Sequence, residues 1–139
     1  SYHCGKGQKE KNRIRTQKFR NKNPLNVKVS NFSSRSLLYY QTRKFRNGNV
    51  KSKIQVSDVL DKLREQNGRC YLTGDIIDIN DAGSFHLDHI LPISKGGNNE
   101  ISNLGICTKE SNHAKFDKTP EEFIELCKKV ILHNSITKI

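Results

Sequence analysis

The chain has 139 residues, of which 33% are hydrophobic and 28% charged, so its length allows one domain with a modest core and a small accessory segment. No stretch approaches the roughly 18 consecutive apolar residues that a membrane-spanning helix needs, and the N-terminus lacks the apolar core of a signal peptide. The net charge of +11 favours an anionic partner, and we expect a cytoplasmic protein with no membrane contact.

Residues 1–57 carry the excess positive charge. They hold 15 basic residues and one acidic residue, whereas residues 58–139 hold 10 basic and 13 acidic residues. Such a segment favours nucleic acid as a partner, because basic side chains that neutralise phosphates release counterions. A disordered solubilising tail is the alternative. Because the chain begins with Ser1 rather than Met, we also expect it to be a piece of a longer protein.

The basic segment shows little hydrophobic periodicity from residue 2 to residue 31, which predicts an extended arm. Ser33 to Ser36 are candidate caps for a helix over residues 37–46, which ends near Gly48. The basic side chains expected to contact DNA from this segment are Arg13, Arg15, Lys18, Arg20, Arg43, Lys44 and Arg46.

A second helix is predicted over residues 58–67, with Ser57 as its N-cap and Gly68 as its stop signal. Residues 84–88 alternate like a strand, and a Gly-rich loop follows. Residues 103–106 then predict the second strand of a hairpin, and Thr108 is a candidate cap for a helix that reaches about residue 117.

The last helix begins at Thr119-Pro120-Glu121-Glu122, which combines a capping box with proline at the first helical position. Its apolar residues follow a period of 3.6, so we expect a structural helix that packs on the core. These residues are Phe123, Ile124, Cys127, Val130 and Ile131.

The carboxyl half therefore reads strand, loop, strand, helix, and polar residues fall at its junctions. Asp88 and His89 close the first strand, and Asn112 lies about one turn into the helix. A helix laid across the hairpin would bring Asp88 and Asn112 together. Two hard oxygen ligands plus water suit Mg²⁺.

These residues also carry a family resemblance. The run LDHILP at residues 87–92, then Gly96-Gly97, Asn103-Leu104, Cys107 and NHAK at residues 112–115 together resemble the HNH nuclease family, also called the ββα-metal fold. The resemblance covers about residues 69–118. It implies an α+β fold in which a ββα-metal hairpin-helix core is joined by additional helices and a basic N-terminal arm. The chain would divide into a basic DNA-binding arm and helix over residues 1–57 and an HNH nuclease domain over residues 58–139.

The resemblance implies a role for each matched residue. Asp88 would be a metal ligand, His89 the general base that activates water, and Asn103 the residue that ties down the loop and orients the base. Asn112 would be the second metal ligand, and because it stands where many relatives have His, it favours Mg²⁺ or Mn²⁺ over Zn²⁺. His113 and Lys115 are candidate DNA contacts, although solvent-facing positions are equally compatible with the pattern. His86 is a further candidate, because it points to the same face of the strand as Asp88.

The cysteines depart from the family pattern. Many HNH domains bind a structural zinc through two pairs of cysteines, but here Cys70 and Cys107 each lack a partner thiol, and Thr73 and Ser111 stand in its place. We therefore expect no structural zinc, with hydrogen bonds and packing in its place.

Two functions follow from these patterns. The first is a metal-dependent DNA endonuclease that leaves 5′-phosphate and 3′-hydroxyl ends, by nicking one strand or cleaving both. The second is a nucleic-acid-binding module whose HNH scaffold is catalytically silent. Both functions are compatible with a chain that acts alone, with a homodimer, and with a piece of a larger protein.

Overall fold

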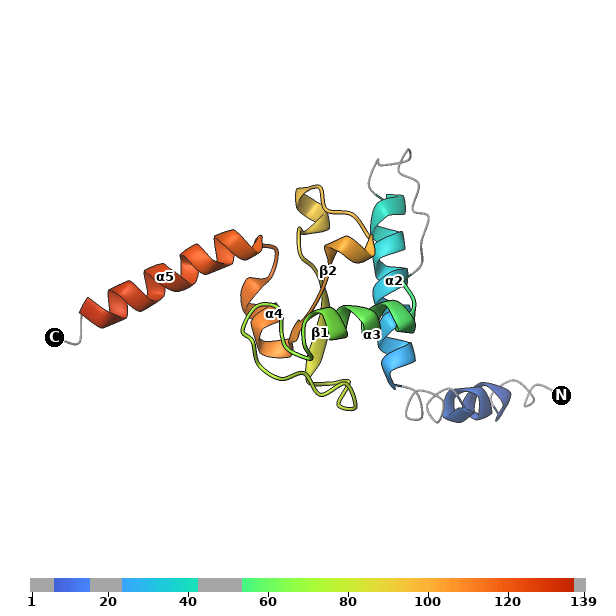
Figure 1. Ribbon diagram of the computed structural model, residues 1–139. Coiled ribbons are helices and arrows are strands. Elements are labelled where there is room, and N and C mark those ends of the chain that lie inside the picture. The colour runs from blue at the N-terminus through green and yellow to red at the C-terminus, as the bar shows by residue number, and fades with distance from the viewer. Residues whose placement is uncertain (1–6, 16–23, 43–53, 137–139) are drawn as a thin grey trace.

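The computed structural model describes residues 7–15, 24–42 and 54–136 (Figure 1). Residues 7–15 are helical. The named elements are α2 (Pro24–Thr42), α3 (Val56–Glu65), β1 (Phe85–His89), β2 (Leu104–Thr108), α4 (Lys109–Lys115) and α5 (Pro120–Ile136), with the short 3-10 helices η1 (Ile93–Lys95) and η2 (Ile101–Asn103) between the strands. The predicted α+β class and the order strand, loop, strand, helix are confirmed. Within the described ranges, no helix is both long and apolar enough to cross a membrane.

The N-terminal segment differs from the extended arm that was predicted. Residues 7–15 are helical, and α2 begins at Pro24, a residue favoured at the first position of a helix. Leu25, Val29 and Phe32 follow a spacing of i, i+4 and i+7 and pack on the core. This short apolar stripe is diluted by the surrounding polar residues, which is why the periodicity was missed.

Helix α2 also replaces the predicted helix over residues 37–46, whose last residues lie outside the described ranges. Ser33 is inside α2 and does not cap it. Its side chain is buried, and its hydroxyl donates to the backbone oxygen of Ile54 at 3.2 Å. The hydroxyl therefore joins α2 to the segment that leads into α3.

Helix α3 begins slightly earlier than predicted, with Gln55 rather than Ser57 at the N-cap. The shift follows from Asp58, whose carboxylate accepts a hydrogen bond from the backbone N–H of Gln55 at 2.7 Å. The predicted stop is confirmed, because Gly68 follows the helix with φ of 70° and its N–H donates to the oxygen of Leu63.

The two strands form an antiparallel hairpin in which Asp88 lies opposite Gly105 and His89 opposite Leu104. Each strand lies within two residues of its predicted position. Helix α4 starts where predicted, with Thr108 as its N-cap and the side chain of Thr108 accepting from the N–H of Ser111. Helix α3 packs on β2 and on α2, and α4 contacts both strands; the hairpin lies between α4 and α2 (Figure 1).

One hydrophobic core joins α2, α3 and the hairpin. It includes residues on both sides of residue 57, where a domain boundary was expected, and that boundary remains a prediction. The buried core residues are Val29, Ile54, Val59, Cys70, Ile77, Phe85, Leu87, Leu104, Ile106 and Cys107.

Helix α5 has the predicted start, since Thr119 Oγ1 accepts from the N–H of Glu122 at 3.2 Å. It does not pack as predicted, because it extends away from the hairpin (Figure 1) and leaves Ile131 65% and Val130 55% exposed. Leu126 and Leu132 are exposed as well. Apolar side chains on several sides of this helix give it no single face that the core could bury.

Candidate active site

The candidate site is built around β1, whose alternating side chains contact residues of two different helices, α4 and α2. His86 and Asp88 contact residues of α4, namely Asn112 and Lys115. His89 points the other way and stacks on Phe32 of α2, with 4.6 Å between the ring centroids. The hairpin therefore places Asp88 and His89 side by side in sequence but in separate surroundings.

Asp88 is held by two donors. Its Oδ2 atom accepts a hydrogen bond from the Tyr71 hydroxyl at 2.5 Å and lies 2.9 Å from Lys115 Nζ. The Asp88 side chain is 12% exposed, and that of Lys115 is fully buried. Lys115 Nζ also donates to the backbone oxygen of His89 at 3.3 Å. Lys115, which was predicted to contact DNA, thus lies beneath the site and neutralises Asp88.

Tyr71 is positioned by the opposite strand. Its backbone N–H donates to the oxygen of Ile106, and its ring lies directly over Gly105, the residue opposite Asp88. Burial and the neighbouring charge of Asp88 raise the pKa of Tyr71, so the phenol keeps its proton and acts only as a donor. Gly105 therefore leaves room for the ring that orients the Asp88 carboxylate.

Replacing Gly105 with alanine tests this packing. The added Cβ would lie 2.5 Å from Cε1 of Tyr71, so we expect the ring to shift and the free energy of unfolding to fall by about 1–3 kcal/mol. Gly83→Ala is the matched control, because its nearest neighbour would be 3.6 Å away. Urea denaturation of both variants gives the comparison. Equal midpoints for the two variants would rule out the close contact.

His89 has surroundings that favour its neutral form. Burial lowers its pKa, which the hydrogen bond with Asn99 and the charge of Asp88 only partly offset. His89 Nε2 lies 3.0 Å from Asn99 Oδ1, and in this arrangement Nε2 carries the proton while Nδ1 holds the lone pair. A neutral imidazole with a fixed tautomer is the form that accepts a proton from water.

The side chain of Asn103 holds together the loop that connects β1 and β2. Its side-chain oxygen accepts from the N–H of Leu91 at 2.8 Å, and its Nδ2 donates to the oxygens of Leu91 and Asn98. Asn98 precedes Asn99, the partner of His89. These hydrogen bonds close the loop, whereas the role of Asn103 in orienting the base remains a prediction.

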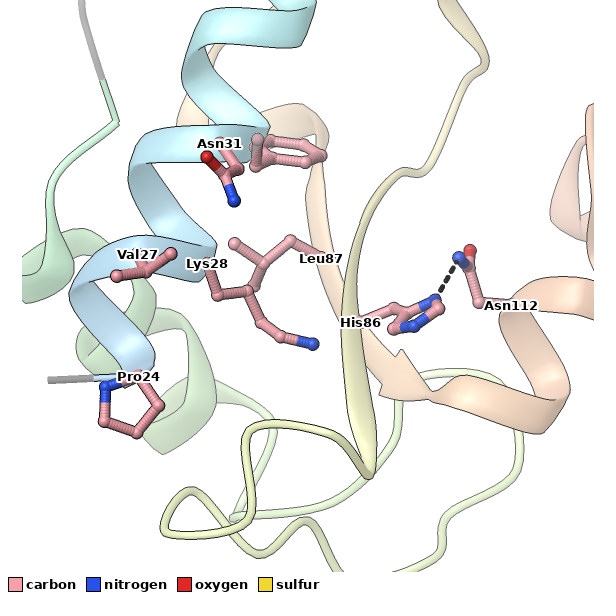
Figure 2. Close-up of a pocket in the computed structure, with 8 residues that line it drawn as sticks. Pro24, Val27, Lys28, Asn31, His86, Leu87 and Asn112 are labelled. Atoms are coloured by element: carbon pink, nitrogen blue, oxygen red, sulfur yellow. Dashed lines mark hydrogen bonds between the residues drawn. The ribbon is translucent and has the colours of Figure 1, made fainter. Parts of the chain in front are cut away.

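Asn112 and His86 meet on the opposite side of β1. Asn112 Nδ2 lies 2.9 Å from His86 Nδ1 (Figure 2), and burial lowers the pKa of His86, which favours an unprotonated acceptor there. His113 is exposed, and its ring meets the His86 ring edge to face with centroids 5.2 Å apart. The predicted DNA contact of His113 is compatible with this exposed position.

The donor atoms of this face fit a hard divalent ion. Asn112 directs its nitrogen to His86, so its oxygen is the atom left for a cation. Asp88 Oδ2 is engaged by Tyr71 and Lys115, so Oδ1 would be its ligand atom. Nowhere in the described ranges do three or more His, Cys, Asp or Glu residues gather as a metal-binding group. Two protein oxygens completed by water match the habits of Mg²⁺ better than those of Zn²⁺.

Cys70 is the centre of a hydrogen-bonded knuckle. Cys70 Sγ accepts from the N–H groups of Thr73 at 3.4 Å and Thr108 at 3.3 Å, and lies 3.4 Å from Ser111 Oγ. Burial alone would raise the pKa of Cys70, but these hydrogen bonds outweigh it and lower the pKa to about 7. The sulfur thus joins the turn before β1 to the start of α4.

Removal of the Cys70 sulfur is expected to lower the stability of the protein. In Cys70→Ala, two backbone N–H groups lose their acceptor, and we expect the free energy of unfolding to fall by about 1–3 kcal/mol. Cys127→Ala, on half-buried α5 surface, is the control. We also expect no stoichiometric zinc by atomic emission and no shift of the melting temperature with a zinc chelator. Bound zinc at one per chain would overturn the hydrogen-bonded knuckle.

The predicted DNA contacts of the basic segment fall into two groups. Arg13 and Arg15 are exposed on the helix over residues 7–15, where Arg13 pairs with Glu10 at 3.7 Å. The other five lie outside the described residues: Lys18, Arg20, Arg43, Lys44 and Arg46.

Sequence reasoning missed three residues that shape the site. Tyr71 orients Asp88, Phe32 covers the ring of His89, and Asn99 sets its tautomer. Tyr71 and Phe32 come from segments 17 and 57 residues away from the residues they contact, and nothing in their local pattern marks them. Asn99 could have been noted, since it is a polar residue in the loop that joins the two motif strands.

Comparison with known proteins gives a family match for the segment that contains this site. Residues 70–121 match the family model described as HNH endonuclease. Among solved structures, the chain is similar to the Type II-C Cas9 enzyme from Actinomyces naeslundii, with 20% sequence identity and a TM-score of 0.44. That match covers 91% of this chain and only 12% of the Cas9 chain. The comparison with curated proteins gave no match.

Proposed function

We propose, from the premise that residues 70–121 form an HNH endonuclease segment, that the chain is a metal-dependent DNA endonuclease. The observation that supports this most directly is the hairpin-helix arrangement within the matched segment. It presents a neutral His89 at the end of β1 and pairs β1 with Asn112 on α4.

His89 is the proposed general base. Its Nδ1 lone pair would take a proton from the attacking water, while Asn99 on Nε2 keeps the ring in the correct tautomer. Phe32 holds the ring by stacking. Asn103 would contribute by fixing the loop that carries Asn99, so it acts through His89 rather than on the phosphate.

Asp88 and Asn112 are the proposed ligands of a Mg²⁺ or Mn²⁺ ion. Such an ion, when bound, stabilises negative charge on the phosphate and on the leaving oxygen. Tyr71 and Lys115 would orient the Asp88 carboxylate for this purpose. Departure of the 3′ oxygen would leave 5′-phosphate and 3′-hydroxyl ends.

The basic segment supports DNA as the substrate. Exposed Arg13 and Arg15 lie in it, and phosphate contacts of this kind set affinity and register more than sequence choice. One such site cuts one strand, so double-strand cleavage would require a homodimer, two encounters, or a larger protein that carries this chain. We place this activity in the bacterial or phage-infected cytoplasm.

A plasmid assay tests the proposal. With Mg²⁺, we expect supercoiled plasmid to become nicked circles that DNA ligase seals without prior end repair, because sealing requires 5′-phosphate and 3′-hydroxyl ends. With EDTA, we expect no nicking. Nicked circles that ligase cannot seal would refute the proposed products, and intact plasmid in Mg²⁺ or Mn²⁺ would refute the enzyme.

A silent nucleic-acid-binding module is the second candidate. The observation in its favour is the ion pair of Asp88 with Lys115, which neutralises the carboxylate without a bound cation. Titration of the protein with Mg²⁺ by calorimetry separates the two candidates. Binding that disappears in Asn112→Ala favours the enzyme, and the absence of binding in both proteins favours the silent module.

A further inference from the structure

A cavity of about 510 Å³ lies between α2 and β1 (Figure 2). Lys28, Asn31 and Phe32 of α2 form part of one wall. His86 and Asn112 lie at the opposite side. Its volume is within the range of pockets that hold small ligands, which is about 300–1,000 Å³.

The α2 wall offers a positive charge and an amide. Figure 2 shows the Lys28 ammonium directed into the cavity, with the Asn31 side chain above it on the same helix. The ammonium donates to the backbone oxygen of Phe85 and lies 4.7 Å from the centroid of the Phe85 ring. This anchored ammonium has three donors, so one bond to Phe85 does not exhaust it.

The cavity also adjoins the proposed catalytic groups. Phe32 lines it and stacks on His89, the proposed base. Asn112 lines it and is a proposed metal ligand. A molecule bound in the cavity would therefore lie next to the phosphodiester that the water activated by His89 would attack.

We propose that this cavity binds one nucleotide of the cleaved DNA strand, next to the scissile phosphate, with Lys28 on its phosphate and Asn31 on its sugar or base. The proposal rests on the nuclease function above. Charge complementarity favours this occupant, because a phosphodiester supplies the anion that Lys28 can bind and residues 1–57 are strongly basic. Leu87 and Val27 supply apolar surface for the sugar and the base.

Two asparagines of α2 provide a matched test. Asn31 lines the cavity, whereas Asn26 is exposed on the same helix and lines a different hollow. Asn31→Asp places a negative charge in the cavity that would hold the anionic nucleotide, and we expect it to weaken binding of a short DNA duplex by about tenfold or more. Asn26→Asp adds the same charge elsewhere and should change the dissociation constant by less than about threefold.

A salt titration tests Lys28 separately. Lys28→Gln should reduce the slope of log affinity against log salt by about 1, as expected for the loss of one phosphate contact. Binding is measured in Ca²⁺, with the absence of cleavage verified in the same samples. Melting temperatures show which variants are folded, and the Asn31 and Asn26 pair decides the question if Lys28→Gln is not.

The outcomes for the cavity and for the enzyme are distinct. Equal loss of affinity in Asn31→Asp and Asn26→Asp overturns the nucleotide site even if the wild-type protein cuts DNA. A loss confined to Asn31→Asp supports the site, and if the wild-type protein then fails to nick in Mg²⁺, the proposed enzyme fails alone. A wild-type protein that binds no DNA overturns both.

Discussion

His89→Ala is expected to lower the rate of DNA nicking by about 10²–10⁴-fold, the usual contribution of a positioned general base. The physical reason is that the variant lacks the imidazole that burial keeps neutral at the end of β1 and whose tautomer Asn99 fixes. Single-turnover nicking of a supercoiled plasmid in Mg²⁺ measures the chemical step without product release.

Two control measurements show whether the loss of nicking is due to the role of His89 as the base. DNA affinity in Ca²⁺ should be unchanged within about threefold, because the base acts mainly in the transition state. His133→Ala, on the exposed surface of α5, should nick at the wild-type rate. A His89→Ala protein that is folded and nicks within about threefold of the wild-type rate would remove His89 from the mechanism.

Lys115→Met is expected to reduce the free energy of unfolding by about 3–5 kcal/mol, because it leaves Asp88 as an unpaired charge in a nearly buried position. Lys115 is fully buried and Asp88 is 12% exposed, so water reaches the position of the lost ammonium poorly. The Tyr71 hydrogen bond remains but carries no charge. Urea denaturation at neutral pH gives the change in stability.

Two further variants show whether lost charge or lost packing causes the change in the free energy of unfolding. Lys109→Met, at an exposed position of the same helix, should change stability by no more than about 0.5 kcal/mol. Lys115→Met combined with Asp88→Asn should regain part of the loss, since neither charge is then buried alone. We also expect Mg²⁺ to stabilise Lys115→Met more than the wild-type protein, because an ion at Asp88 would replace the missing positive charge. A double variant no more stable than Lys115→Met would mean that packing, not charge, causes the loss.

The sequence predicted best those structural features that depend on residues close together in the chain. The hairpin, the Thr108 cap and the Thr119 capping box were all predictable, because each depends on residues a few positions apart. Asn103 is a similar case, since one side chain bonds both ends of the loop that it closes. The assigned roles of Asp88, His89 and Asn112 remain predictions.

The features that were missed depend on contacts between distant segments. Phe32 reaches His89 across 57 residues, and Lys115 reaches Asp88 across 27. Lys115 shows the difficulty most clearly. A lysine beside a motif residue is usually a solvent-facing cation, and only the fold shows that its charge is enclosed and matched. The basic composition of residues 1–57 likewise concealed the apolar stripe by which α2 joins the core.

Strand β2 continues into α4 without an intervening loop, because Thr108 is both the last residue of the strand and the N-cap of the helix. Deleting one residue from β2 would turn the following strand side chains to the opposite face of the hairpin. It would also rotate Asn112 by about 100° around the axis of α4 and away from His86. The junction should thus tolerate substitutions but not changes of length, and evolutionary insertions and deletions should concentrate beyond Lys115, where no proposed ligand follows.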